Sequence, residues 1–361
     1  MSGATEPLHV RGVRLPDEQH VDLWIRDGHL SYEPVRGART VGSGWILPGL
    51  VDLHCHVGTD AQGATSVEVT ERQALTNRDA GALLLRDAGS AADTRWIDER
   101  EDLPAMVRAG RHIARPARYL RNYASEVEPE DLVDEVCRQA ARGDGWVKLV
   151  GDWIDREVGD MTPLWTVATL AAAVAAAHRI GARLTTHAFS RQALADALDA
   201  GFDCIEHGTG LDEELIARMA AAGTALVPTL VNVEENFPGI AAGGEAKFPT
   251  YAAHMRRLWE GAGARIGAAY EAGVPIYVGT DAGGAIAHGR VVDEIAVLVR
   301  AGLPTEYALG GACWRAREYL ARPGLAEGDP ADLLVLAEDP RANLDTLRAP
   351  QRILLRGHVV R

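Results

Sequence analysis

Side chains able to bind a metal ion occur at five separate points in the sequence, each at the end of an apolar segment typical of a buried β-strand. They are His54 and His56 in GLVDLHCHVG, Lys148 in GWVKLVG, His187 in RLTTHAF, His207 in DCIEHGTG and Asp281 in IYVGTDAGG. Imidazole and carboxylate groups are common ligands of zinc and similar divalent ions. The pattern therefore predicts a metal site, provided that the fold brings these strand ends together.

The His-x-His pair and the lysine carry most of this chemistry. Side chains two residues apart on a strand point to the same face, so His54 and His56 face one way and Cys55 the other. Lys148 lies inside the strand WVKLV, where an unpaired ammonium group would be costly to bury. Burial lowers the pKa of a lysine, and its neutral amine can then react with CO₂ to give a carbamate that bridges two cations. The alternative is a lysine that reaches solvent at the strand end.

The remaining three positions also have simpler interpretations. His187 and His207 could each be a hydrogen-bonded histidine at the end of a strand, and Asp281 could be a helix cap or a turn residue. Taken singly, these interpretations are favoured. Because all the positions fall at the ends of predicted strands, their chance placement is improbable, and we favour one shared metal site.

The elements that must position these residues are alternating buried strands and helices, a pattern typical of a parallel sheet covered by helices. Eight strands are predicted, near Ile46–Val51, Ala82–Asp87, His112–Tyr119, Trp146–Val150, Arg183–Thr186, Cys204–Glu206, Thr224–Val227 and Pro275–Val278. Eight strand–helix units favour an α/β fold, a (β/α)₈ TIM barrel, in which strand ends converge on one rim. A doubly wound sheet fits the alternation too, but not the distribution of ligand-type residues.

Helix boundaries are well marked between several of these strands. Ser190 can cap one helix and Gly201 ends it, whereas Asp212 can cap the next one and Gly223 ends it. One long helix is predicted over 251–272. The segment 228–249, with a glycine cluster and three prolines, is predicted to be a long loop, either a mobile lid or an ordinary irregular loop.

The two ends of the chain have a different pattern of apolar and polar residues from the middle. LHVRGVRL and VDLWIRDGHLSYEPV near the start, and ADLLVLAED and QRILLRGHVVR near the finish, alternate apolar and polar residues as half-exposed antiparallel strands do. We expect residues 1–47 and 325–361 to form antiparallel β structure outside the barrel of residues 48–324.

Composition narrows the class of partner. The formal net charge is −14, from 37 basic and 51 acidic residues, which disfavours nucleic acid or an anionic membrane and leaves a small-molecule substrate. Four widely spaced cysteines indicate reduced thiols. The sequence shows neither a signal-peptide pattern nor a run of about 18 apolar residues, so we expect a cytoplasmic protein. Self-association into a homo-oligomer stays open.

These residues carry a resemblance to a known family. The sequence resembles the amidohydrolase superfamily, in its binuclear group with a carboxylated lysine, and within that group it is similar to the imidazolonepropionase-like and prolidase-like peptidases. The matching segments cover nearly the whole chain: WILPGLVDLHCH, LLRDAG, VKL, TTHA, IEHGT, GTDAG, HGRVVDEIAVLVRAGL and EGDPADLLVLAEDP. The resemblance implies that the β structure of residues 1–47 and 325–361 is a small β-sandwich domain.

The resemblance implies a role for each ligand-type residue. His54, His56 and Asp281 would hold the more buried of two divalent ions, His187 and His207 would hold the second, and carboxylated Lys148 would bridge both. The ions would be Zn²⁺, with Mn²⁺, Fe²⁺, Co²⁺ or Ni²⁺ as alternatives. A hydroxide bridging the metals would be the nucleophile, and Asp281 would act as general base and then as general acid.

Substrate contacts are less well marked. His288, in an HG pair that relatives carry, could touch substrate or order its loop. Relatives often carry a glycine- and histidine-rich loop after the third strand, but RPARYLRNYASEVEPE stands here. Its Arg118, Arg121 and Tyr123 are candidates to bind a substrate carboxylate, for which arginine is well suited. Trp153 follows the fourth strand and is expected to shape the pocket.

A second polar pair ends the second strand. Arg86 and Asp87 match an R-D pair in relatives, and we expect a structural ion pair that supports the barrel.

Hydrolysis of an amide-type C–N bond, in a dipeptide, an N-acyl amino acid or a cyclic amide, is the leading hypothesis. The same centre could serve a deaminase, although the deaminases of this superfamily mostly lack the bridging lysine, or a lactone, ester or organophosphate hydrolase. A non-catalytic scaffold protein is the alternative from another class, and the intact set of ligand-type residues disfavours it.

Overall fold

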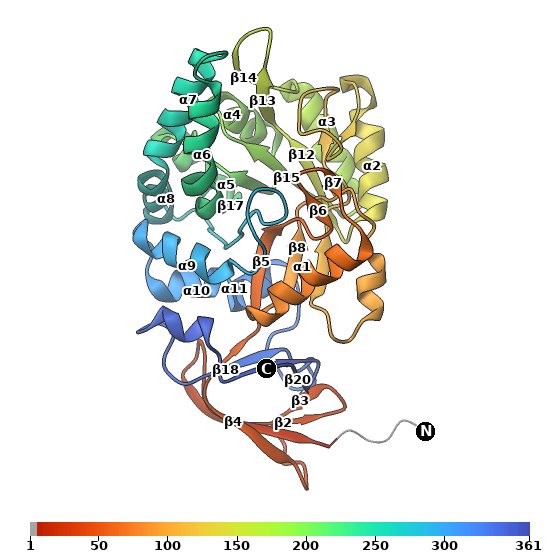
Figure 1. Cartoon of the computed structure of the whole chain (residues 1–361), viewed down its shortest axis with the longest axis vertical. Coiled ribbons are helices and arrows are strands. Elements are labelled where there is room, and N and C mark those ends of the chain that lie inside the picture. The colour runs from red at the N-terminus through yellow and green to blue at the C-terminus, as the bar shows by residue number, and fades with distance from the viewer. Residues whose placement is uncertain (1–5) are drawn as a thin grey trace.

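The computed structural model describes residues 6–361, so residues 1–5 of the predicted 1–47 segment lie outside the described residues. Both chain ends meet in a seven-stranded sheet at the lower end of the molecule in Figure 1, with strand order β20-β19-β18-β4-β1-β2-β3. Its strands are β1 (Leu8–Arg14), β2 (Gln19–Arg26), β3 (His29–Ser31), β4 (Arg39–Pro48), β18 (Leu333–Leu336), β19 (Arg352–Leu355) and β20 (His358–Val359).

This sheet forms because its strands alternate as the sequence predicts. In β2, Leu23 and Ile25 are buried while their neighbours are more exposed, and they pack with Val10, Ile46 and Leu333 in a separate hydrophobic cluster. β18 pairs antiparallel with β4, so the last part of the chain is joined to the first by backbone hydrogen bonds. The expectation that both ends build one small β unit is confirmed to that extent.

The rest of the chain is an α/β arrangement of parallel strands covered by helices (Figure 1). One sheet has the order β5-β8-β9 and the other β11-β10-β12-β15-β16-β17. The strands are β5 (Leu50–Cys55), β8 (Ala82–Asp87), β9 (Ala105–Arg108), β10 (Ile113–Ala114), β11 (Ser125–Glu126), β12 (Trp146–Val150), β15 (Arg183–Ala188), β16 (Cys204–His207) and β17 (Ala225–Val227).

Helices and short hairpins connect these strands. The helices are α1 (Val67–Asp79), α2 (Leu132–Arg142), α3 (Val167–Arg179), α4 (Arg191–Ala200), α5 (Glu213–Ala222), α6 (Leu230–Gly244), α7 (Pro249–Glu260), α8 (Ala262–Glu271), α9 (Val291–Arg300), α10 (Thr305–Gly311) and α11 (Trp314–Tyr319), with 3₁₀ turns at Arg95–Glu99, Pro129–Asp131 and Leu344–Arg348. The hairpins are β6 (Thr59–Asp60) with β7 (Gly63–Ala64), and β13 (Asp152–Asp155) with β14 (Asp160–Pro163). No helix of the described residues is long and apolar enough to cross a membrane.

An extended segment, residues 275–282, joins the two parallel sheets. Tyr277 N donates to Leu226 O in β17 at 2.9 Å, and Leu53 N in β5 donates to Val278 O at 2.9 Å. Isolated parallel bridges occur at Leu226–Ile276 and Cys55–Ala282. The predicted last strand is thus placed between β17 and β5, although its pairing is too sparse to form a continuous ladder.

The helix caps predicted from the sequence are confirmed. The Ser190 hydroxyl accepts from Ala193 N at 3.3 Å and the Asp212 carboxylate accepts from Leu215 N at 2.9 Å. Gly201 and Gly223 end these helices with φ of 84° and 68°, a conformation that costs glycine little.

Three predictions about elements are wrong. The third parallel strand is β9, not residues 112–119, where the structure has only the two-residue β10. Arg115 O accepts from Arg118 N in a turn and Ala117 has a φ of 58°, so the chain bends away from the sheet just after Pro116. The predicted helix 251–272 is divided into α7 and α8 at Gly261, whose ψ of 6° is not helical.

The third wrong prediction concerns residues 228–249, which were expected to be a loop. Most of this segment is helix α6, despite Pro238 within it. Its buried Leu230, Val231, Val233 and Phe237 pack into the main hydrophobic cluster, and this apolar face stabilises the helix against the proline and the glycines.

Candidate metal centre

The ligand-type residues gather at the carboxyl ends of the parallel strands. His54 lies near the end of β5 and Lys148 lies in β12. His187 is the second-last residue of β15, and His207 is the last residue of β16. All four are buried, and Asp281, after the segment 275–280, is partly buried. His207 and Asp281 have φ of 70° and 59°, a strained conformation for residues other than glycine that is often found at functional sites.

The histidine pair and the aspartate are in direct contact. His54 Nε2 lies 3.1 Å and His56 Nε2 lies 3.0 Å from Asp281 Oδ1, and the two Nε2 atoms are 3.2 Å apart. Potential ligand atoms of His54, His207 and Asp281 all lie within 4.8 Å of one another. The rings of His187 and His207 are 4.7 Å apart, so the structure brings these five residues together.

The Nδ1 atoms of three histidines form hydrogen bonds with other groups of the protein. His56 Nδ1 donates to Gly89 O at 2.9 Å, His54 Nδ1 donates to Glu206 Oε2 at 2.8 Å, and His207 Nδ1 hydrogen bonds to Thr229 Oγ1 at 2.7 Å. A carbonyl or carboxylate oxygen only accepts, so Nδ1 of His54 and of His56 carries the proton. In their neutral form these rings would direct Nε2 lone pairs at the Asp281 carboxylate.

This arrangement fits a bound cation. With neutral histidines, Nε2 of His54, Nε2 of His56 and Oδ1 of Asp281 are three acceptor atoms with no hydrogen between them, and a cation would stabilise that contact. His187 Nε2 is also buried without a hydrogen-bond partner among the described residues. The donor set of imidazole and carboxylate is the one that zinc and similar ions prefer.

Lys148 lies close to the charged groups of the centre. It is 1% exposed, and burial lowers its pKa, while the charges of Glu206 and Asp281 oppose that effect. In the parallel pairing of β12 with β15, Lys148 lies beside Thr185. A lowered pKa increases the fraction of neutral amine, which is the form that reacts with CO₂.

Glu206 is a central residue that the sequence analysis did not identify. It is fully buried and accepts hydrogen bonds from His54, Thr185 and the Arg86 guanidinium. Burial alone would raise its pKa, but the charges of Arg86, His54 and Lys148 hold the pKa well below its usual value. The signal was present in DCIEH, where a glutamate occurs inside an otherwise apolar buried strand.

The expected ion pair between Arg86 and Asp87 does not form. Neighbouring side chains on a strand point to opposite faces, so Arg86 reaches Glu206 while Asp87 accepts from Gly89 N and Ser90 Oγ. Asp87 thereby holds the loop whose Gly89 carbonyl orients His56.

The start of helix α6 provides two further contacts that the sequence analysis missed. Asn232 Nδ2 donates to Asp281 Oδ2 at 2.6 Å, and Thr229 contacts His207 as described above. The buried carboxylate of Glu294 in α9 accepts from Leu230 N at 2.7 Å and from Val231 N at 2.8 Å. It thus satisfies free amides of the first helical turn.

A cavity of about 630 Å³ opens beside these residues. His56, His187 and Asp281 form its floor, and the predicted Tyr123 and Trp153 line it. Tyr123 donates through its hydroxyl to Asp60 O at 2.7 Å, which fixes its ring in the wall. Such a partly apolar cavity next to polar groups is the usual form of a small-molecule site.

The three other predicted substrate contacts do not line this cavity. Arg118 donates to Asp155, to Trp153 O and to Thr162, at 2.7 to 3.2 Å, and so holds the β13–β14 hairpin. Arg121 lines an adjoining cavity of about 990 Å³, which shares Tyr119, Leu120 and Trp153 with the first. His288 accepts from Asn77 Nδ2 of α1 at 3.0 Å, and burial lowers its pKa to about 4. Their role as substrate contacts stays a prediction.

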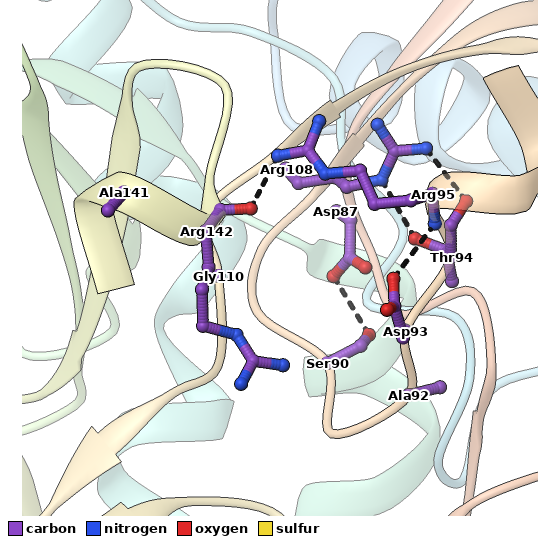
Figure 2. Close-up of a pocket in the computed structure, with 10 residues that line it drawn as sticks. All are labelled: Asp87, Ser90, Ala92, Asp93, Thr94, Arg95, Arg108, Gly110, Ala141 and Arg142. Atoms are coloured by element: carbon purple, nitrogen blue, oxygen red, sulfur yellow. Dashed lines mark hydrogen bonds between the residues drawn. The ribbon is translucent and has the colours of Figure 1, made fainter. Parts of the chain in front are cut away.

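A smaller cavity of about 250 Å³ lies behind the loop that carries Asp87 and Ser90 (Figure 2). Arg95 and Arg108 face it, and both form ion pairs with Asp144, at 2.7 Å and 3.0 Å. The guanidinium groups of Arg95 and Arg108 are thus already paired with a carboxylate, and both side chains support the structure around this cavity.

Comparison with known proteins identifies the family. The chain belongs to the Amidohydrolase family, whose model matches residues 45–360, so it is a hydrolase and the resemblance to this superfamily is confirmed. Uncharacterized proteins of Mycobacterium tuberculosis and Mycobacterium bovis are 57% identical to it over 352 residues, which cover 97% of this chain and 95% of theirs.

Solved structures share the fold. A Xaa-Pro dipeptidase with methionine bound in its active site superposes with a TM-score of 0.81 at 21% identity, over 98% of this chain and 99% of that one. Ochratoxinase of A. niger superposes with a TM-score of 0.79 at 18% identity, over 98% of this chain and 96% of that one. At these identities the likeness concerns the fold alone.

Proposed function

We propose that this protein is a metal-dependent amidohydrolase that cleaves an amide-type C–N bond in a small-molecule substrate. The observation that carries the proposal is the meeting of His54 Nε2, His56 Nε2 and Asp281 Oδ1 within 3.0 to 3.2 Å. Neutral histidines have no hydrogen to place between these acceptors, so a cation is the group that fits.

The binding residues divide between two divalent ions, zinc being the first candidate. His54, His56 and Asp281 would hold one ion, and His187 and His207 the other, with Lys148 as a carbamate contributing to both. Divalent ions there would lower the pKa of water and polarise a substrate carbonyl. The buried Nε2 of His187, which lacks a partner in the described residues, supports its assignment as a ligand.

Asp281 is the proton carrier in this proposal. Its Oδ1 faces the histidines, whereas Oδ2 accepts from Asn232 and is held in one orientation. Asp281 takes the proton of the attacking water and passes it to the departing nitrogen, which would otherwise leave as an unstable anion.

The proposal also includes a closed (β/α)₈ barrel of residues 48–324 with a β-sandwich domain from 1–47 and 325–361. Backbone contacts support closure at two places: Asp144 N, just before β12, donates to Arg108 O at the end of β9, and Leu53 N donates to Val278 O. The carboxyl ends of barrel strands are where the catalytic residues of such folds lie.

The test uses the fact that the chain has two lysines, Lys148 and Lys247. Purified protein should contain about two zinc or other divalent ions per chain, measured by mass spectrometry. Lys148→Ala should lower the metal content and abolish amide hydrolysis, while Lys247→Ala, at an exposed position, should change neither. With ¹³C-labelled bicarbonate, a carbamate resonance should appear in the Lys247→Ala variant and be missing in Lys148→Ala.

Two results would contradict the proposal. One is full activity of Lys148→Ala. The other is normal activity of wild-type protein that contains no stoichiometric divalent metal in a strong chelator.

A further inference from the structure

The wall of the cavity beside the metal centre is mainly aromatic. Tyr119 and Trp153 lie edge to face with ring centroids 4.7 Å apart, and Phe189 and Phe237 do so at 4.8 Å. Phe189 also contacts His187, with centroids 4.1 Å apart. The aromatic surface therefore begins at a proposed metal ligand and extends outward along the cavity.

Apart from the proposed metal ions, the same cavity has no cationic side chain among its lining residues in the described chain. Neither lysine nor arginine is among its lining residues in the described chain, whereas the carboxylates of Asp281 and Glu235 are. Arg118, which could have served, donates to the β13–β14 hairpin. Arg290 contacts Glu235 at 2.8 Å and also pairs with Asp293, so its charge is already compensated.

These two features act in opposite directions on charged and uncharged ligands. A carboxylate transferred from water into this cavity would lose its hydration without gaining an arginine or lysine partner, and it would face Glu235. An uncharged ligand avoids that cost. An aromatic or bulky apolar group gains by leaving water and by contact with the rings of Tyr119 and Trp153.

We propose that the cavity selects uncharged amides with an aromatic or bulky apolar substituent, and disfavours dipeptides and N-acyl amino acids that carry a free carboxylate. The inference rests on the proposed function, because it assumes that the scissile carbonyl lies at the metal centre. It narrows that function to one substrate class: neutral secondary amides, including anilides and cyclic amides.

Binding is tested apart from turnover with two sulfonamides, which lack the reactive carbonyl. N-(2-phenylethyl)methanesulfonamide and N-methanesulfonyl-L-phenylalanine differ by one carboxylate. Titration calorimetry on wild-type protein with its metal content measured should show that the neutral compound binds at least about tenfold more tightly, since an unpaired carboxylate is costly to bury. Equal or tighter binding of the acid, or no binding of either compound, would overturn the inference.

A designed charge in the wall provides a second readout. Ile240 in α6 lines the cavity and is 39% exposed, so an arginine there is tolerated and can reach a ligand. Ile240→Arg should tighten binding of the acid about tenfold, as a charge-assisted hydrogen bond would, and leave the neutral compound nearly unchanged. The matched control is Ile180→Arg, exposed after α3 and outside the cavity; equal tightening there would overturn the inference.

Turnover separates this inference from the function on which it rests. N-(2-phenylethyl)acetamide and N-acetyl-L-phenylalanine form the corresponding pair of amides. If both are cleaved and the acid has the higher kcat/KM, the substrate class is wrong and the amidohydrolase function stands. If the neutral sulfonamide binds more tightly but a panel of neutral amides is not cleaved, the preference of the cavity stands and the proposed function fails.

Discussion

The buried contact between Glu206 and Arg86 allows a quantitative test of what holds His54 in place. Both side chains are fully buried, so solvent does not screen their charges. The substitution Glu206→Gln keeps the size of the side chain and removes its charge. It leaves the Arg86 guanidinium buried with Leu53 O, 2.6 Å away, and the ring of Trp146 as its remaining partners.

The expected loss in the free energy of unfolding is about 3–5 kcal/mol, the usual cost of leaving one partner of a buried ion pair uncompensated. An exposed pair gives the contrast. Glu234 and Arg300 are 2.9 Å apart with side chains 48% and 60% exposed, so Glu234→Gln should cost only about 0–1 kcal/mol. The same chemical change thus differs several-fold in effect because of burial.

The assay is urea unfolding of the metal-free proteins, with metal binding measured separately. Bound metal stabilises the folded state through its own affinity and would otherwise mask the electrostatic loss. Glu206→Gln should also weaken metal binding about 10- to 100-fold, because it replaces the charged acceptor that orients His54 with a neutral amide. The double variant Arg86→Met/Glu206→Gln should recover part of the stability, since it removes the uncompensated cation.

The reasoning would be refuted by a Glu206→Gln variant whose unfolding free energy lies within about 1 kcal/mol of wild type, the range of an exposed pair. A double variant that is less stable than Glu206→Gln by the full cost of Arg86→Met would also refute it, because the two residues would then act independently.

Two further predictions concern the elements around the centre. Burial raises the pKa of Glu294 to about 8 from a usual 4.5, so the stability that its protonated form contributes is present below about pH 4.5 and is lost as the pH rises through about 8. The melting temperature of wild type should therefore fall relative to Glu294→Gln between these pH values, and a constant difference would contradict this. Asn232→Leu removes the donor to Asp281 Oδ2 and should lower kcat/KM about 10- to 100-fold at unchanged metal content; an unaltered kcat/KM would show that Asn232 does not orient the proton carrier.

The arrangement around Glu294 shows how distant parts of the chain are coupled to the centre. Its carboxylate, in α9, holds the first amides of α6, and α6 in turn contributes Asn232 to Asp281 and Thr229 to His207. Changes in α9 are therefore transmitted to two proposed metal ligands through one helix terminus. The residues of α6 that line the cavity, including Phe237 and Ile240, depend on the same anchoring.

Local patterns in the sequence were sufficient for most of the elements and for the ligand-type residues that gather at the candidate site. Apolar strands ending in histidine or aspartate placed His54, His187, His207 and Asp281 at the same edge, because parallel strands connected by helices present their carboxyl ends together. The caps at Ser190 and Asp212 could be predicted because capping depends on a residue and its next three neighbours.

Only the tertiary structure decided which side chains meet. Glu206 pairs with Arg86 and His54 through the register of strands far apart in the sequence, and no local pattern reveals such a register. The third strand, β9, is short and follows a polar stretch, so packing against β8 rather than its own composition makes it a strand. The lack of cationic side chains in the cavity could not be predicted for the same reason. Whether Arg118 can bind a ligand depends on the β13–β14 hairpin, which accepts hydrogen bonds from its guanidinium group.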